Sequence, residues 1–120
     1  MMSTQQIASR LAELMSKGKF EDAQKELFAD DAVSIEPVQS EVFAKETKGL
    51  RAIMEKGHKW ESMIEKMHSC STSQPLVAGN AIALTLSMDV TMKGRGRTQL
   101  AEICAYEVKD GKIRSEQFFM

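Results

Sequence analysis

The second half of the chain changes from the hydrophobic period of a helix to that of a strand, and this change constrains the fold more than any other feature. From His68 onward, apolar and polar residues alternate through four segments separated by short turns that contain glycine. Such alternation predicts β-strands. Because short turns join antiparallel neighbours, we expect an antiparallel meander. The four segments are MHSCSTSQPLVAG, NAIALTLSMDVTMKG, RTQLAEICAYEVKDG and KIRSEQFFM.

The first half of the chain has helical periodicity. Ser3 and Gln6 have capping-box spacing at the start of a first predicted helix, which Gly18 ends. A second helix in KFEDAQKELFADD, a short strand in AVSIEP, an irregular QSEVFAKETK and a third helix in KGLRAIMEKGHKWESMIEK follow. Helices followed by a meander predict an α+β fold with the helices on one face of the sheet.

Length and composition indicate one domain, residues 1–120, that needs no disulfide or structural metal. With 16 basic and 17 acidic residues, we expect neither nucleic acid nor a membrane as partner. No signal peptide or apolar span is recognisable, so the protein is expected to be soluble and cytoplasmic, with Cys70 and Cys104 as free thiols. Neither HExxH nor GxSxG occurs, and no metal site is predicted.

Four segments carry a resemblance to a known family: ELFADDAVSIEP, KGLRAIMEKGHKW, SMDVT and AYEVKDGKIRSEQFF. In these segments and in its order of elements the chain resembles the NTF2-like superfamily and, within it, the small SnoaL-like, polyketide cyclase-like bacterial proteins. The resemblance implies a cone-shaped fold, in which a strongly curved sheet and three helices enclose a cavity, and a homodimer formed through the outer sheet face. The superfamily includes isomerases, dehydratases and cyclases beside members that only bind ligands or proteins, so the fold alone does not set the function.

The KDGK turn decides which residues of the last two strands share a face. A three-residue loop with Gly111 in the left-handed region would pair Cys104 with Glu116 and Glu102 with Phe118. A two-residue turn would instead move Glu116 to the face opposite Glu102. We favour the three-residue loop, which groups Glu102, Tyr106 and Glu116.

A four-residue GRGR loop would add Asp89 to that face, opposite Glu102. The aliphatic residues of the same strand, from Leu84 to Val90, would then lie on the other face. We expect the polar face to be concave and to line the cavity, and the aliphatic face to be convex and covered by a partner subunit. The reverse assignment, with the aliphatic residues inside, is the alternative.

The candidate catalytic residues are Asp89, Glu102 and Glu116. In a poorly hydrated cavity, desolvation and mutual repulsion raise the pKa of carboxyl groups, so that one can abstract or donate a proton near neutral pH. Tyr106 could hydrogen bond a developing enolate oxygen. The alternative is that these acids form an ordinary solvated face.

The candidate ligand-binding residues are Glu36, Trp60, His68, Tyr106 and Phe118. Trp60 either fills the core or forms an apolar wall, and Glu36 either reaches the cavity mouth or is solvated. His68 is preferred over His58. Phe118 stands where many SnoaL-type enzymes have Asp, so the resemblance transfers no complete catalytic set.

Three functions remain open at this stage. The first is a cofactor-independent isomerase, dehydratase or cyclase that acts on a small apolar or carbonyl-containing ligand. The second is a noncatalytic module that binds such a ligand. The third is a protein-interaction domain that uses the outer sheet face.

Overall fold

The structure is a computed structural model that describes residues 1–120. It has three helices and seven strands, two strands more than predicted, and it confirms the α+β fold. The elements are α1 (Thr4–Ser16), α2 (Phe20–Leu27), β1 (Phe28–Ile35), β2 (Glu46–Lys48), α3 (Leu50–Ser62), β3 (Ile64–Thr72), β4 (Leu76–Ala78), β5 (Ala81–Met92), β6 (Gly96–Lys109) and β7 (Lys112–Phe119). None of the three helices has the length and apolar content that a membrane crossing requires.

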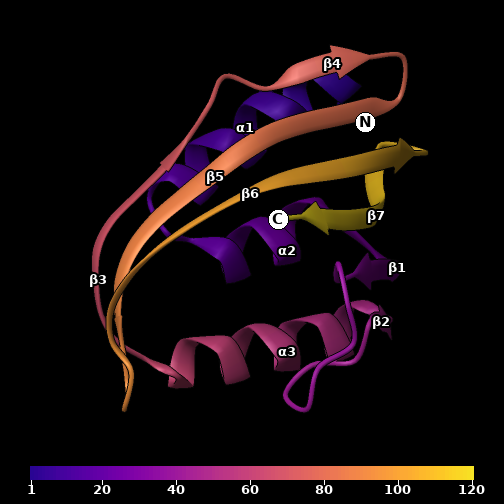
Figure 1. The fold of residues 1–120 in the computed structure, drawn as a ribbon. Helices are drawn as coiled ribbons and strands as arrows, with labels where there is room; N and C mark the ends of the chain where they lie inside the picture. Colours follow the sequence, from indigo (N-terminus) through magenta and orange to yellow (C-terminus); the bar gives the residue numbers. More distant parts are fainter.

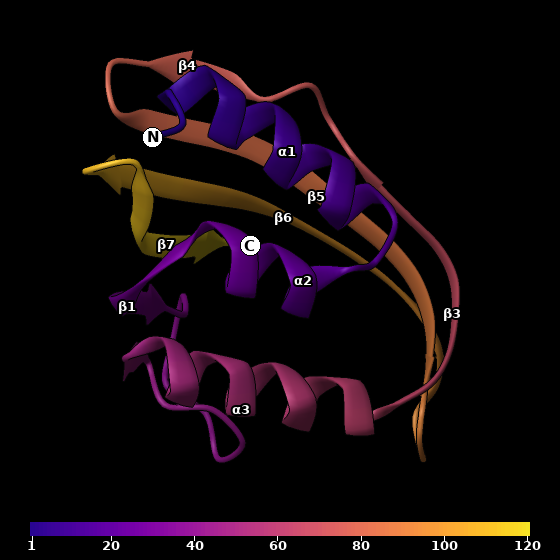
Figure 2. The ribbon, with the colours of Figure 1, turned by 180° about the vertical axis from the view of Figure 1, so that it is seen from behind.

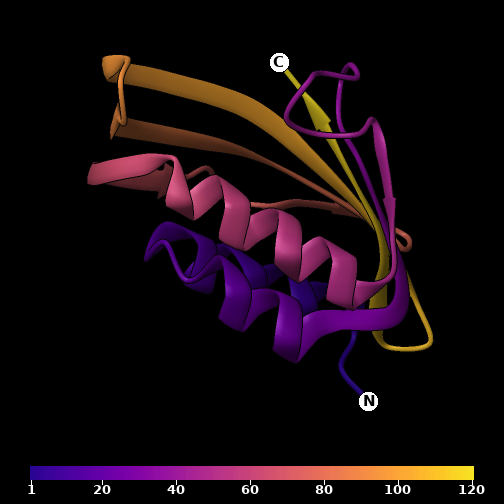
Figure 3. The same cartoon turned by 90° about the horizontal axis from the view of Figure 1, so that it is seen from below.

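The sheet has the strand order β2-β1-β7-β6-β5-β3, and the short β4 pairs with β5. All neighbours are antiparallel except β1 and β7, which run parallel. The long strands bend strongly, so the sheet curves around the helices (Figures 1 and 2). All three helices lie on its concave side (Figure 3). This is the predicted cone.

The element boundaries differ from the expected ones in four places. Strand β1 begins at Phe28, inside a segment that was predicted to be helical. Strand β3 begins at Ile64 rather than at His68, because α3 ends at Ser62. The segment containing Pro75 divides the first predicted strand into β3 and β4. The end of the predicted irregular segment forms β2, which pairs with β1.

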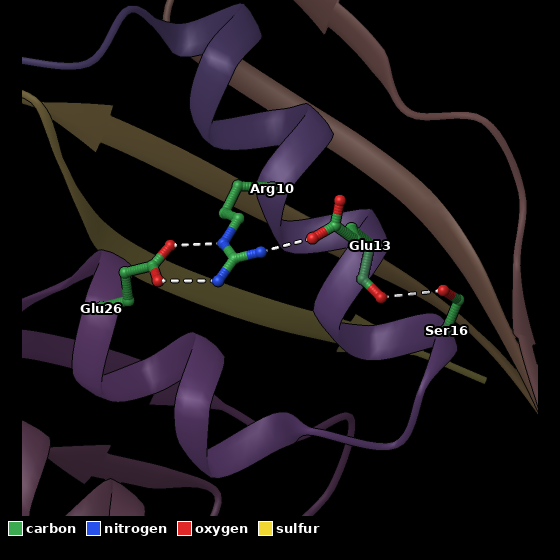
Figure 4. A network of polar contacts seen from close by, with 4 residues as sticks. All are labelled: Arg10, Glu13, Ser16 and Glu26. Carbon is green, nitrogen blue, oxygen red and sulfur yellow. Dashed lines mark hydrogen bonds and ion pairs between the residues drawn. The ribbon is translucent and has the colours of Figure 1, made fainter.

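The two N-terminal helices are held together on their exposed side by Arg10. Ser3 caps α1 in a capping box with Gln6, as predicted. From α1, Arg10 donates hydrogen bonds to both carboxylate oxygens of Glu26 on α2, at 2.7 and 3.0 Å, and also contacts Glu13 (Figure 4). A bidentate pair of this kind fixes the relative orientation of its two partners. It therefore helps to set the angle at which α2 follows α1.

The aliphatic face of β5 is concave, which corrects the prediction that it is convex. Leu84, Leu86, Met88 and Val90 are buried in one core cluster with residues of the helices. Only the concave face is covered by helices, so burial of apolar surface selects this orientation. The convex face carries mostly small or polar side chains, among them Ala83, Thr85, Ser87, Ala101 and Ala105.

The hairpin between β6 and β7 has a two-residue turn, so the three-residue loop is wrong. Lys109 pairs with Lys112, and the turn residues Asp110 and Gly111 have φ values of 52° and 74°. Positive φ at both positions defines a type I′ turn, whose twist matches that of the flanking strands.

A β-bulge then restores the face that the shorter turn would have reversed. Val108 pairs with Ile113, but Glu107 pairs with Ser115, so Arg114 is the extra residue. As a result, Glu116 pairs with Tyr106 rather than with Cys104, and Phe118 pairs with Cys104 rather than with Glu102. The predicted grouping of Glu102, Tyr106 and Glu116 on one face is thus present, although the register is different.

The turn type can be tested by substitution. We expect Gly111→Ala and Asp110→Ala each to lower the free energy of unfolding by about 1 kcal/mol, because alanine is strained at positive φ. Asp110→Asn should be nearly neutral, since asparagine tolerates this region. Urea denaturation measures all three. A neutral Asp110→Ala variant would contradict the type I′ turn, because Asp110 would then lie in the right-handed region.

Candidate functional site

A pocket of about 340 Å³ lies between the helices and the concave face of the sheet. Most of its lining residues are hydrophobic, and they come from the three helices and from the sheet. Trp60 is among them. The apolar wall includes Leu11, Met15, Phe20, Phe28, Ile53, Met54, Trp60, Leu86, Met88, Leu100 and Phe118.

Five polar side chains line the inner part of this pocket: Glu36, Lys56, Glu102, Tyr106 and Glu116. Tyr106 and Glu116 are paired on adjacent strands, and Glu102 lies on the same face of β6 as Tyr106 because strand side chains alternate. Glu116 is only 5% exposed. The sheet therefore brings two of the three predicted acids together in a mainly apolar setting.

Lys56 joins these acids from α3. Its Nζ donates hydrogen bonds to Ser34 Oγ at 2.6 Å and to Glu36 Oε2 at 2.9 Å, and it lies 5.6 Å from the centroid of the Phe118 ring. The sequence analysis missed both Lys56 and Ser34. A signal for Lys56 was present, because it follows the core residue Ile53 by three positions and precedes Trp60 by four, and so shares their helix face.

Burial raises the pKa of Glu102 to about 7, and the charges of Glu36 and Glu116 act in the same direction. Burial also raises the pKa of Glu116 to about 7, while a hydrogen bond from Ser34 and the charge of Lys56 lower it and Glu36 raises it. Both carboxyl groups can therefore gain or lose a proton near neutral pH.

Tyr106 supplies a hydrogen-bond donor beside the two acids. Its hydroxyl donates to Met15 Sδ at 3.4 Å, and its ring meets that of Phe28 edge to face at 6.4 Å between centroids. Burial raises the pKa of Tyr106 well above its ordinary value, so the hydroxyl stays protonated. A thioether is a weak acceptor, and a ligand oxygen in the pocket would be a stronger one.

Asp89 is not in the pocket, and its predicted position opposite Glu102 is wrong. Because Met92 pairs with Gly96, the loop between β5 and β6 spans three residues, and Leu86 is the residue opposite Glu102. Asp89 lies on the convex face, where Arg97 donates to its carboxylate oxygens at 3.0 and 2.8 Å. The hydrogen bond from Arg97 lowers the pKa of Asp89.

His68 is also absent from the pocket lining. Its Nε2 lies 2.7 Å from Thr91 Oγ1, on the convex side of β5. The other histidine, His58, does line the pocket, where its Nε2 lies 3.0 Å from Glu21 Oε1 across α2 and α3. Both partners are partly exposed, so this ion pair marks the rim of the pocket.

The chain matches the family model of the SnoaL-like domain over residues 2–120. It belongs to the SnoaL-like family. No protein of curated function matches it in sequence.

Solved structures resemble this SnoaL-like chain along nearly its whole length. One is a protein from Mesorhizobium loti, whose name gives two descriptions, a proposed SnoaL-like polyketide cyclase and a carbohydrate phosphatase. It is 32% identical to this chain, with a TM-score of 0.90, and the match covers 99% of this chain and 100% of that chain. An NTF2-like protein from Burkholderia thailandensis (15% identity, TM-score 0.83, 99% and 91% coverage) shares the fold. A proposed isomerase from Bacillus subtilis also shares the fold, with 19% identity, a TM-score of 0.74, and coverage of 98% of this chain and 88% of that chain.

The raised pKa of Glu116 makes the stability of the fold depend on pH. Between pH 4.5 and about 7 the unfolded chain ionises this carboxyl and the folded chain does not, so the free energy of unfolding falls as pH rises through this window. We expect Glu116→Gln to remove this dependence. Relative to the unsubstituted protein, the variant should gain about 3 kcal/mol between pH 4.5 and pH 8.

Urea denaturation at the two pH values measures this gain. Glu107→Gln is the matched control, because Glu107 lies on the opposite face of the adjacent strand and is exposed. An equal change of stability with pH in both variants would show that Glu116 is ordinarily solvated.

Proposed function

We propose that this SnoaL-like protein binds a small, mainly apolar molecule with a carbonyl group and catalyses proton transfer on it with Glu102 and Glu116. The observation that carries the proposal is the pair of carboxyl groups with a pKa of about 7 in one apolar pocket. One carboxylate can remove a proton beside a carbonyl while a neutral carboxyl donates one. Isomerisation, dehydration and aldol cyclisation all need these two steps.

Tyr106 supports a carbonyl-containing ligand. Its hydroxyl donates to the sulfur of Met15, and a hydrogen bond to an oxygen that gains negative charge would stabilise an enolate. The same buried position excludes water, which strengthens that interaction.

The charges that face the pocket favour an uncharged ligand. The lining includes one lysine, Lys56, which is already paired with Glu36. It also includes five glutamates: Glu21, Glu36, Glu61, Glu102 and Glu116. A phosphate ester or carboxylate would meet repulsion from this set.

Binding can be followed through Trp60, which is the only tryptophan and lines the pocket. Titration with a panel of cyclic ketones should change its fluorescence saturably. Carboxylate analogues of the same size should bind at least about tenfold more weakly, because the pocket is acidic. Equal binding of ketone and carboxylate would contradict the assignment of an uncharged ligand.

Catalysis can be followed as deuterium exchange from solvent into the carbon next to the carbonyl, measured by proton NMR. We expect Glu102→Gln and Glu116→Gln each to lower the enzyme-dependent rate by about 10²-fold or more, the usual contribution of a general acid or base. Glu107→Gln should keep the full rate. Saturable binding without exchange above the buffer rate would contradict catalysis and favour the noncatalytic binding module.

A homodimer through the convex face stays a prediction. Ile103 and Phe119 are 49% and 48% exposed and belong to strands whose convex side otherwise carries small or polar side chains. Exposed apolar residues on a broad sheet face are suited to a second copy of the chain. Sedimentation of the protein and of its Ile103→Lys variant tests this, since the charged variant should be monomeric if the face is the interface.

A further inference from the structure

We propose that Lys56 and Ser34 are positioning residues that make Glu116 the first acid of the pair to ionise and leave the shared proton on Glu102. The proposal deepens the proposed function by giving the two acids separate roles, with Glu116 as the base and Glu102 as the acid. It rests on the direction of the hydrogen bonds around the two carboxyl groups.

The direction of the hydrogen bonds follows from the donors. An ammonium group has three protons and no acceptor, so Ser34 Oγ must be the acceptor in its 2.6 Å contact with Lys56. The hydroxyl proton of Ser34 is then free for another partner. Ser34 is fully buried, and Glu116 is its direct neighbour across the parallel β1–β7 pairing.

The hydroxyl of Ser34 therefore donates to the Glu116 carboxyl, and this hydrogen bond lowers the pKa of Glu116 against the effect of burial. A donor aimed at a carboxyl group stabilises its ionised form. Lys56 acts twice on Glu116, once through its charge and once by orienting the Ser34 hydroxyl.

Glu102 has a different environment. Its hydrogen-bonding neighbour is the Cys104 thiol, a weak donor whose Sγ lies 3.8 Å from Glu102 Oε1. Besides burial, the charges of Glu36 and Glu116 raise its pKa, and the opposing effect of Lys56 is the smallest contribution. Two neighbouring carboxyl groups that share a site do not both ionise easily, so the proton stays on the one with fewer donors.

The groups that face Glu116 come from three elements. Strand β1 contributes Ser34, and Glu36 acts from just beyond its end; α3 contributes Lys56; and β6 contributes Glu102, Cys104 and Tyr106. Lys56 is the only cation among them. The charge balance of the acid pair consequently depends on this one side chain.

These roles define the proton steps. The C–H bond next to the substrate carbonyl breaks and its proton moves to a Glu116 carboxylate oxygen, while the Glu102 carboxyl gives its proton to the carbonyl oxygen and an enol forms. The reverse transfers return both carboxyl groups to their starting states. Where the enol is conjugated with a second double bond, Glu116 can return the proton to the far carbon of that double bond while Glu102 recovers its own proton, and this gives the isomer. No atom or electron is supplied from outside the pair and the substrate.

The test is a titration of the glutamate side-chain carboxyl carbons by carbon-13 NMR between pH 4 and pH 9, without any ligand. In the unsubstituted protein, the first ionisation of the pair should be observed at Glu116. In Ser34→Ala, the pKa of Glu116 should rise by about one unit, a tenfold change in proton affinity, while Glu102 shifts less. Ionisation of Glu102 first, or equal shifts of both residues in Ser34→Ala, would overturn the proposal.

Lys56 is tested by a matched pair of variants. Lys56→Met should raise the pKa of Glu116 by about one unit or more, because the variant keeps the length of the side chain but not its charge. Lys56→Arg should restore most of the original value. If the role of Lys56 were merely structural, the pKa of Glu116 would be the same in Lys56→Met and Lys56→Arg. That result would also overturn the proposal.

Two features keep the outcome clear. Ser34→Thr retains the hydroxyl, so it should titrate like the unsubstituted protein, and the Lys56 pair answers the question if Ser34→Ala does not fold. Because the titration uses no ligand, a failure to find exchange on any ketone would reject the proposed function and leave the assignment of charge intact. A reversed order of ionisation would reject the assignment alone.

Discussion

Strand β7 is hydrogen bonded along both edges, and the candidate site depends on this double pairing. Its parallel pairing with β1 brings Glu116 next to Ser34, and its antiparallel pairing with β6 brings the same residue next to Tyr106. A strand fixed on both sides cannot slip by one residue without losing two ladders of hydrogen bonds. The fold can therefore hold a carboxyl group in the apolar interior, where it would otherwise turn toward water.

That burial has a thermodynamic consequence. A carboxyl group with a pKa of about 7 destabilises the folded state at neutral pH, because the unfolded chain ionises it freely. The loss is offset by the large apolar surface that β5 and the helices bury on the concave face. A destabilising group retained in a well-packed core is typical of a functional site.

The order of helices and strands, the family and the antiparallel meander could be predicted because they depend on local periodicity and turn residues. The hairpin register could not, because the bulge at Arg114 leaves no mark in the alternation of KIRSEQFFM. Asp89 was misplaced for a similar reason. The glycines of KGRGR allow loops of several lengths, and a different loop length reverses the face of every residue in the preceding strand.

Lys56 and Ser34 were missed because their importance is not local. A lysine in an amphipathic helix is usually solvated, and a serine in a strand is usually unremarkable. Only the assembled sheet shows that Lys56 contacts Glu36 and Ser34, and that Ser34 stands between Lys56 and Glu116. The grouping of Glu102 and Glu116 was predicted from a three-residue turn, and it is present because the two-residue turn and the bulge at Arg114 together leave both residues on one face.

The pocket draws its two kinds of wall from different parts of the chain. The acid pair and Tyr106 come from the sheet, whereas Phe20, Ile53, Trp60 and other apolar side chains come from the helices. Substitutions of these apolar helix residues can therefore change the size and shape of an acceptable ligand, while the acids of the sheet and Lys56 keep the proton chemistry unchanged. Such a division lets a lineage explore new ligands by single substitutions, without first rebuilding the groups that react.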